Sequence, residues 1–379
     1  MSHSPKIAFV QDALPHPGGA ERVLAAAWEI YPEAPLYTLL YRKEAFENTP
    51  LAEKTLIPSF INRLPFVTTH YRSYLPLMPL AMERFDLREF DIILSFSYAV
   101  AHGILPRPNQ LHISYTYTPL RYAWHHYHQY MAEKGLRSGV KGWIVQGILH
   151  YLRLWDRAAA DRVDRFVAPS QWVAGGIWRS YRRPATVIYP PVDTQRFSPQ
   201  DSREDFYLTI SRLVAHKKVD LLVEAFSRLG YPFLIIGEGP EYKRLQKLAA
   251  PNVKLLGWLS NDQVSDLLGR ARAFVQAAEE DFGIAIAEAH AAGCPVIAYG
   301  NGGGLEIVIP GKTGILYPEQ TVSSVIAAVE EFETGDSEFD EHQIALSAER
   351  FSKAHFKEQL MSLVADTWSR FKSGERDHW

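Results

Sequence analysis

Two glutamates at a short spacing are the strongest candidates for ligand chemistry in this chain. Glu280 and Glu288 enclose the run Asp-Phe-Gly-Ile-Ala-Ile-Ala, which follows a short apolar segment at 273–276. We expect a strand there and a helix that begins at Gly283, so free backbone N–H groups at 282–284 would form an anion site. A carboxylate beside such a site can accept hydrogen bonds from sugar or ribose hydroxyls. Taken alone, the run also fits an acidic helix start without a ligand.

A pair of cations precedes these acids in the chain. Arg212 and Lys217 lie five residues apart just after the apolar segment 206–210, with Ser211 between that segment and Arg212. Charge-assisted hydrogen bonds from such a pair suit a diphosphate, at about 1.5–3 kcal/mol each. Fixed cations aimed at a departing nucleoside diphosphate stabilise its developing charge, so this chemistry needs no divalent metal. A surface basic turn is the alternative interpretation of the pair taken alone.

The elements expected around these residues form two series of alternating strands and helices. In the first half, strands are expected at 6–11, 36–40, 91–96, 111–115, 165–168 and 186–189, with helices at 20–31, 140–160 and 171–181. Proline and polar residues at 190–204 interrupt the pattern, as in an inter-domain connection. The second series has strands at 206–210, 233–236, 253–255, 273–276, 296–298 and 315–316, helices at 219–229, 241–249, 262–270 and 283–292, and helical periodicity over 323–371. This alternation predicts an α/β fold with parallel, doubly wound sheets, which bind ligands at the carboxyl ends of their strands.

The composition fits a two-domain protein of a reducing compartment. The chain has 379 residues, 47% of them hydrophobic, which exceeds one ordinary α/β domain, and its net charge of −3 provides no field for nucleic acid. The single cysteine, Cys294, excludes an intramolecular disulfide and a multi-cysteine metal site. Because no charged leader with an apolar stretch precedes the first strand and no apolar run has the length of a membrane span, a cytoplasmic protein is expected.

A basic and aromatic stretch at 121–183 has two interpretations. It contains 11 Lys/Arg against 4 Asp/Glu, together with five tryptophans. Such a mixture can sit at an anionic membrane surface, which would make the protein peripheral at the inner face of the membrane. A solvated face with core aromatics is the alternative. The run His125-His126-Tyr127-His128 cannot place three imidazoles on one face and has no neighbouring carboxylate or cysteine, so an aromatic loop facing an acceptor is favoured over a metal site.

Together, the motifs resemble the GT-B glycosyltransferases and, within them, the large retaining family 4. The resemblance lies in segments that follow the order and spacing of the family: 18–22, 211–217, 237–240, 257–260, 280–288 and 300–314. The segment 112–124 is similar to the mannosyltransferase-like branch of bacterial surface polysaccharide assembly. The resemblance implies two Rossmann-like domains that face each other across a cleft. These would be an N-terminal acceptor domain at 1–198, a C-terminal donor domain at 199–351 and a helix at 352–379 that packs back on the first domain.

The resemblance also implies roles for the matching residues. Arg212 and Lys217 would bind the donor diphosphate, Glu288 the ribose hydroxyls and Glu280 the hydroxyls of the transferred sugar. Further donor contacts would come from loop and backbone groups of Gly18, Gly19, Ser211, Gly237, Gly257, Trp258, Leu259, Phe282, Gly283 and Ile284.

Two positions depart from the pattern of the family. Lys218 stands where the family usually has Gly, and Tyr117 stands where it usually has an active-site His before Thr-Pro. Tyr117 could donate a hydrogen bond, but its hydroxyl does not titrate near neutrality. His102, just past the strand at 91–96, is a second candidate for the catalytic position, and a packed loop histidine is the alternative for it.

The function expected from the sequence is therefore transfer of a hexose, with retention and without metal or cofactor. The donor would be a nucleotide-diphosphate sugar, with UDP and a glucose-type sugar favoured and GDP-mannose next. The acceptor would be a glycan or a lipid-linked molecule in polysaccharide or glycolipid biosynthesis. A nucleotide-sugar epimerase or hydrolase and a non-catalytic binding module are the alternatives. A dehydrogenase is disfavoured because no Gly-x-Gly-x-x-Gly joins the first strand to its helix.

Overall fold

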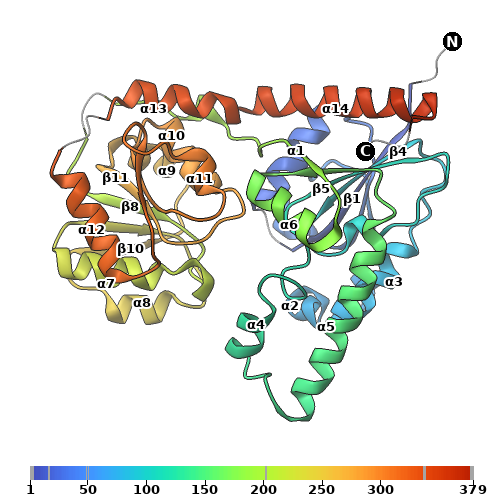
Figure 1. Cartoon of the computed structure of the whole chain (residues 1–379), viewed down its shortest axis with the longest axis horizontal. Coiled ribbons are helices and arrows are strands. Elements are labelled where there is room, and N and C mark those ends of the chain that lie inside the picture. Colours follow the sequence, from blue (N-terminus) through green and yellow to red (C-terminus); the bar gives the residue numbers. More distant parts are fainter. Residues whose placement is uncertain are drawn as a thin grey trace. The chain divides into compact units, whose positions relative to one another are not determined.

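The computed structural model describes residues 4–15, 18–47, 49, 51–200, 203–335 and 339–375, with 68, 69 and 133 described by their backbone alone. The chain forms two units (Figure 1). The first unit contains the chain up to Tyr189 together with the segment from Lys357, and the second unit runs from Pro190 to Phe356. The division falls within the proline-rich stretch that interrupts the sequence pattern.

The first unit is built on a parallel sheet with the strand order β3-β2-β1-β4-β5-β6-β7. Its strands are β1 (Ile7–Leu14), β2 (Leu36–Tyr41), β3 (Leu56–Pro58), β4 (Ile92–Ser97), β5 (Leu111–Thr116), β6 (Arg165–Ala168) and β7 (Ala185–Val187). The short strand β3, which ends in a proline, is not among the strands that the sequence predicts. It lies at the edge of the sheet, where a residue without an N–H group is tolerated.

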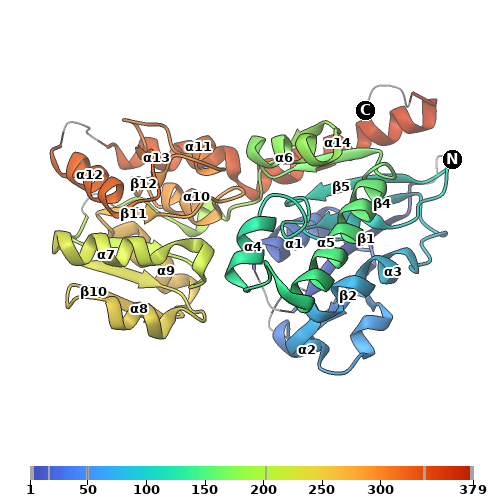
Figure 2. The same cartoon turned by 60° about the horizontal axis from the view of Figure 1, so that its bottom comes forward.

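Helices and short 3-10 turns connect these strands. The α-helices are α1 (Gly19–Ile30), α2 (Val67–His70), α3 (Met78–Glu83), α4 (Tyr127–Glu133), α5 (Gly139–Ala160) and α6 (Gln171–Tyr181). The 3-10 helices are η1 (Lys43–Ala45), η2 (Phe60–Arg63), η3 (Tyr71–Leu77) and η4 (Ala101–Gly103). The N-terminal part of α5 extends away from the sheet of this unit in Figure 1, and the rotated view in Figure 2 brings that end forward.

The second unit has a parallel sheet with the order β10-β9-β8-β11-β12-β13. Its strands are β8 (Tyr207–Ile210), β9 (Phe233–Ile236), β10 (Val253–Gly257), β11 (Ala273–Gln276), β12 (Val296–Tyr299) and β13 (Gly314–Tyr317). From β8 the chain proceeds to one edge of the sheet, and from β11 it proceeds to the other. The carboxyl ends of β8 and β11 therefore form the switch point at which such sheets bind ligands.

The helices of the second unit follow the expected series until its last segment. They are η5 (Thr194–Arg196), η6 (Ala215–Lys217), α7 (Val219–Leu229), α8 (Tyr242–Leu248), α9 (Asn261–Arg270), α10 (Ile284–Ala291), α11 (Gly304–Ile307), α12 (Val322–Glu333), α13 (Glu341–Ala348) and η7 (Glu349–Phe351). The continuous helical pattern expected over 323–371 is divided into α12, α13 and α14 (Lys353–Ser373). Gly335, at a φ of +75°, follows the end of α12, and the Asp340 side chain caps α13 by accepting from the N–H of Gln343.

The helix α14 begins in the second unit and continues in the first. Within the first unit, Lys357 Nζ lies 3.3 Å from Glu29 Oε2 of α1. None of the helices in the described ranges combines the length and the apolar character that crossing a bilayer requires.

Glycines allow the loops at the ligand-binding edge of the second sheet to approach one another closely. The N–H of Ser211 donates to the carbonyl of Ile236, and the N–H of Gly237 donates to the carbonyl of Gly257. A Cβ at Gly237 would lie 1.9 Å from the carbonyl oxygen of Ser211, and the φ of this glycine is +140°. A side chain at this position would therefore push the β8 loop, with Arg212, out of place.

Replacing Gly237 by Ala should destabilise the second unit by about 2–4 kcal/mol, since it combines a backbone clash with a strained φ. Gly269→Ala is the matched control, because its Cβ would meet only the flexible side chain of Gln200 at 3.2 Å and would lie within a helix. Urea unfolding of both variants measures the difference. Equal stability of the two variants would contradict the close approach.

A carboxyl group lies against the glycine loop at the start of α1. The Glu21 carboxyl accepts from the N–H groups of Gly18 and Glu21, and a Cβ at Gly18 would lie 3.1 Å from Glu21 Oε2. Burial raises the pKa of Glu21 to about 7, although the two backbone hydrogen bonds oppose that shift. The folded chain thus holds this proton more tightly than the unfolded chain does.

The raised pKa of Glu21 predicts a loss of stability as the pH rises. The stability that the protonated Glu21 contributes is complete below the ordinary pKa of 4.5. This stability falls as the pH rises and is lost above about pH 7. Glu21→Gln should therefore raise the melting temperature, relative to the unmodified chain, more at pH 8 than at pH 5. The exposed Glu89→Gln in the same unit is the control, and an equal effect of Glu21→Gln at both pH values would count against the shift.

Candidate active site

The cation Lys217 and the carboxylate Glu280 meet at the switch point of the second sheet. Lys217 ends η6 after β8, and Glu280 lies in the loop between β11 and α10. Lys217 Nζ lies 2.7 Å from Glu280 Oε1 and 2.5 Å from Glu280 Oε2. The side chains are 22% and 17% exposed, so the pair is accessible from solvent. The structure thus brings together two residues that lie 63 positions apart and that the sequence assigned to one donor.

The glycine segment near 302 fixes the loop that carries Glu280. The carbonyl of Glu280 accepts from the N–H of Gly303 at 2.7 Å, and Glu280 forms an isolated parallel bridge with Gly302. A Cβ at Gly302 would lie 2.5 Å from the oxygen of Glu280, and one at Gly303 would lie 2.4 Å from the backbone of Phe282. Glycine is required at both positions because the two backbones lie so close. Gln276 Nε2 further donates to Glu280 Oε1 at 3.2 Å.

Glu288 is held by an arginine that the sequence did not single out. It lies on α10 and is 5% exposed, and its Oε1 lies 2.9 Å from the guanidinium of Arg196. Arg196 ends η5, and its guanidinium also packs over the ring of Phe197. A buried carboxylate is costly without a partner. The stretch 190–204 was expected to be only a connection, so the partner of Glu288 was missed.

Arg212 and Lys218 lie on the same loop as Lys217. Arg212 is exposed, and within the described part of the second unit its guanidinium has no hydrogen-bond or ion-pair partner. Lys218, which departs from the family pattern, has a φ of +54° and immediately precedes α7. A left-handed conformation costs an L-residue roughly 1–2 kcal/mol, which explains why glycine suits this position.

The other expected donor-binding groups of the second unit lie on the loops after β10 and β11. Gly283 precedes α10 with a φ of +106°, and the helix that starts at Ile284 leaves its first N–H groups without intrahelical partners. The ring of Phe282 is buried against Phe351, so this residue can offer only its main chain to a ligand. Gly257 ends β10, followed by Trp258, which is exposed, and Leu259, which is half-buried.

In the first unit, Tyr117 supports the start of α1. Its hydroxyl donates to the carbonyl of Ala20 at 2.8 Å, next to Gly18 and Gly19. Burial raises the pKa of Tyr117 well above its usual range. Its hydroxyl therefore holds the glycine loop in position and does not exchange a proton near neutrality.

His102 is a packed histidine, contrary to its candidacy for a catalytic role. Its side chain is 1% exposed, Nδ1 lies 3.0 Å from Ser97 Oγ, and Nε2 lies 3.3 Å from Asp156 Oδ1. Asp156 Oδ2 also accepts from Trp124 and Tyr181. Both imidazole nitrogens thus face protein groups and neither is available to a substrate.

A buried carboxylate at the end of β1 was also missed. Asp12 accepts from four successive N–H groups, those of Tyr98, Ala99, Val100 and Ala101, at 2.6–2.9 Å. It fixes the loop between β4 and η4. The sequence predicts a strand that ends at Gln11, and its pattern gives no role to the acid that follows.

The described residues contain no group of three or more His, Cys, Asp or Glu side chains arranged to hold a metal ion.

The second unit resembles known glycosyltransferases in sequence. The model of the family "Glycosyl transferases group 1" matches residues 192–350. An uncharacterized glycosyltransferase of Methanocaldococcus jannaschii is 29% identical over 186 residues, which cover 48% of this chain and 50% of that protein. A GDP-mannose-dependent phosphatidylinositol monomannoside mannosyltransferase of Mycobacterium tuberculosis is 33% identical over 207 residues, 46% of this chain and 54% of that protein. The chain thus matches about half the length of these curated relatives.

Solved structures resemble the whole chain in fold. Sucrose-phosphate synthase from Thermosynechococcus elongatus has a TM-score of 0.69 at 16% identity, covering 96% of this chain and 99% of that one. HepE of Anabaena in complex with UDP and glucose has a TM-score of 0.66 at 17% identity, covering 96% of this chain and 100% of that one. The chain has the two-domain GT-B fold, and its second unit, which carries Arg212, Lys217, Glu280 and Glu288, matches the model of the group 1 glycosyl transferases.

Proposed function

We propose that this protein transfers a hexose from a nucleotide-diphosphate sugar to a glycan or lipid-linked acceptor, with retention of the anomeric configuration. The observation that carries the proposal is the contact between Lys217 and Glu280 at the switch point of the second sheet. A cation and a carboxylate that bind each other without ligand can bind the two halves of a sugar diphosphate. Lys217 would turn to the phosphate, and Glu280 would accept from the hydroxyls of the sugar.

Each of the other residues has a complementary task in this proposal. Arg212 is exposed on the β8 loop and would join Lys217 on the diphosphate. Glu288 would accept from the ribose hydroxyls, with the guanidinium of Arg196 holding its carboxylate in position. When the bond from the anomeric carbon to the diphosphate oxygen breaks, Arg212 and Lys217 would stabilise the charge on the leaving group. The acceptor oxygen would attack from the same face and give its proton to that leaving phosphate, so no metal is required.

We propose GDP-mannose as the first donor to test, ahead of UDP-glucose. The sequence motifs alone favoured UDP, but several relatives are described as GDP-mannose-dependent mannosyltransferases, among them proteins of Mycobacterium tuberculosis and Corynebacterium glutamicum. A thermal-shift panel of nucleotide sugars ranks the donors, because a ligand that binds only the folded chain raises its melting temperature. Rapid, acceptor-independent release of free or epimerised sugar would instead indicate a hydrolase or an epimerase.

Removing either cation of the proposed diphosphate site should lower turnover. Arg212→Ala and Lys217→Ala should each reduce kcat by about 10²–10³, the usual cost of losing one donor to a developing oxyanion. Lys218→Gln is the matched control, since it removes the same charge one position further along the loop. Transfer assays measure kcat of each variant, and the same assays with EDTA show whether transfer needs a metal. Near-normal rates in both alanine variants would refute this assignment.

We also propose that α5 attaches the protein to an anionic membrane. Residues spaced by three, four or seven along this helix expose an apolar stripe to solvent. Trp143 is 76% exposed, and the other exposed members are Val140, Ile144, Tyr151 and Leu154. A surface helix normally turns its apolar side inward. No acidic residue occurs from 134 to 155, while Lys134, Arg137 and Lys141 do, so the charge complements anionic lipid headgroups.

The apolar stripe predicts lipid-dependent binding. The double variant Trp143→Ser and Ile144→Ser should weaken co-sedimentation with phosphatidylglycerol-containing vesicles at least about 10-fold, because two apolar side chains no longer enter the bilayer. Leu248→Ser on α8 is the control, since Leu248 is 53% exposed in the second unit. Unchanged sedimentation of the double variant would rule out α5 as the contact.

A further inference from the structure

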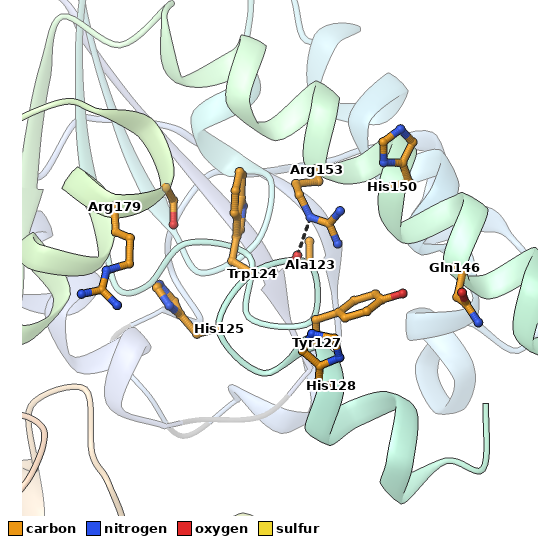
Figure 3. A pocket seen from close by; sticks show the side chains of 10 residues that line it. Ala123, Trp124, His125, Tyr127, His128, Gln146, His150, Arg153 and Arg179 are labelled. Carbon is orange, nitrogen blue, oxygen red and sulfur yellow. Dashed lines mark hydrogen bonds between the residues drawn. The ribbon is translucent and has the colours of Figure 1, made fainter. Parts of the chain in front are cut away.

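The first unit contains a polar cavity that the donor site does not use. It has a volume of about 600 Å³, which is within the range of ligand-binding pockets. The lining residues belong to the first unit and come from the loop before α4, the helix α4 itself, one side of α5 and the end of α6 (Figure 3). They are Ala123, Trp124, His125, Tyr127, His128, Gln146, His150, Arg153, Arg179 and Ser180.

The permanent charge that lines this cavity comes from arginine. Two arginines and three histidines line it, and no carboxylate is among its described lining residues. Asp156, on the same α5 helix, is buried away from it, where it accepts from Trp124 and Tyr181. A cavity with this lining favours an anion.

Several of these groups are available to a ligand. Within the described part of the first unit, Arg179, His125, His128 and His150 have no hydrogen-bond or ion-pair partner. The Oγ of Ser180 is buried without a hydrogen-bond partner among the described residues, and Ser180 is 6% exposed. Unpartnered buried hydroxyls are uncommon in folded proteins, and this one belongs to a residue that lines the cavity.

The remaining arginine is fixed in place. Arg153 Nε donates to the carbonyl of Ala123 at 2.7 Å, and its guanidinium lies 5.2 Å from the ring centre of Tyr127 and 6.0 Å from that of Trp124. Its terminal nitrogens remain as preorganised donors. Figure 3 shows Arg179 and His125 on one side of Trp124 and Arg153, with Gln146 and His150 on the other.

We infer that this cavity binds the phosphate or diphosphate group of the acceptor, with the two aromatic rings beside it for an attached sugar or lipid. Arginine forks and histidines match the several oxygens of a phosphate. This inference rests on the proposed glycosyl transfer, since it assigns the acceptor a chemical class. The same phosphate chemistry could come from a lipid-linked diphosphate or from a soluble sugar phosphate.

The test is calorimetric titration of the full chain in the presence of a saturating nucleoside diphosphate, which occupies the donor site. The probes are inorganic pyrophosphate, geranyl diphosphate and glucose 6-phosphate, with methyl glucoside as the neutral probe. Arg179→Gln and His150→Gln should each weaken the anionic probes about 10- to 100-fold, as expected for the loss of one charge-assisted hydrogen bond. Arg157→Gln is the control: it lies on α5 outside the cavity, paired with Asp161.

The outcomes separate the two levels of the proposal. Failure of the nucleoside diphosphate itself to bind would overturn the proposed function. If the nucleoside diphosphate binds normally but the anionic probes bind all three variants with equal affinity, the anion site alone is overturned. Binding of methyl glucoside as tight as that of the anionic probes would also overturn the anion site. Tighter binding of geranyl diphosphate than of pyrophosphate would support a lipid-linked acceptor, and tighter binding of glucose 6-phosphate would support a soluble one.

Discussion

The ion pair between Lys217 and Glu280 depends on the order of strands in the second sheet. Because β8 and β11 are neighbours although 62 residues of chain separate Ile210 from Ala273, their following loops emerge side by side at the same edge. One loop supplies cations and the other supplies a carboxylate. The site therefore offers opposite charges within hydrogen-bond distance, which suits a ligand that carries both phosphates and hydroxyls.

The loops can meet only because glycine replaces a side chain where backbones touch. Gly237 admits the carbonyl of Ser211, while Gly302 and Gly303 admit the backbone of the Glu280 loop. These glycines do no chemistry themselves. They set the distance between the groups that do, which is why a motif of glycines recurs between the charged motifs along the chain.

The first unit places its buried charges differently. Asp12 accepts from four backbone N–H groups, and Asp156 accepts from an indole and a phenol and lies 3.3 Å from the His102 imidazole. Both carboxylates are thereby used in fixing loops and helices, so they are not available to a ligand. The cavity around α4, α5 and α6 is lined instead by two arginines and three histidines, with no carboxylate among its described lining residues.

The amino-acid sequence by itself determined the alternation of strands and helices, since short apolar runs and helical periodicity are local properties. Its motifs, through their resemblance to a known family, also led to the expectation that Lys217 and Glu280 contact one ligand. The sequence did not predict the division of 323–371 into three helices or the edge strand β3. The local signals for them are weak: Gly335 has a positive φ after α12, and β3 ends in a proline at the edge of the sheet.

Only the tertiary structure decided which charged residues are available. His102 and Glu288 are both polar residues within apolar surroundings in the sequence, and nothing local reveals that one faces Asp156 and the other Arg196. Likewise, His125, His150 and Arg179 belong to three separate segments that packing brings around one cavity. Partner choice for a buried or half-buried charge is a long-range property, because it is set by which elements pack together and not by the residues on either side.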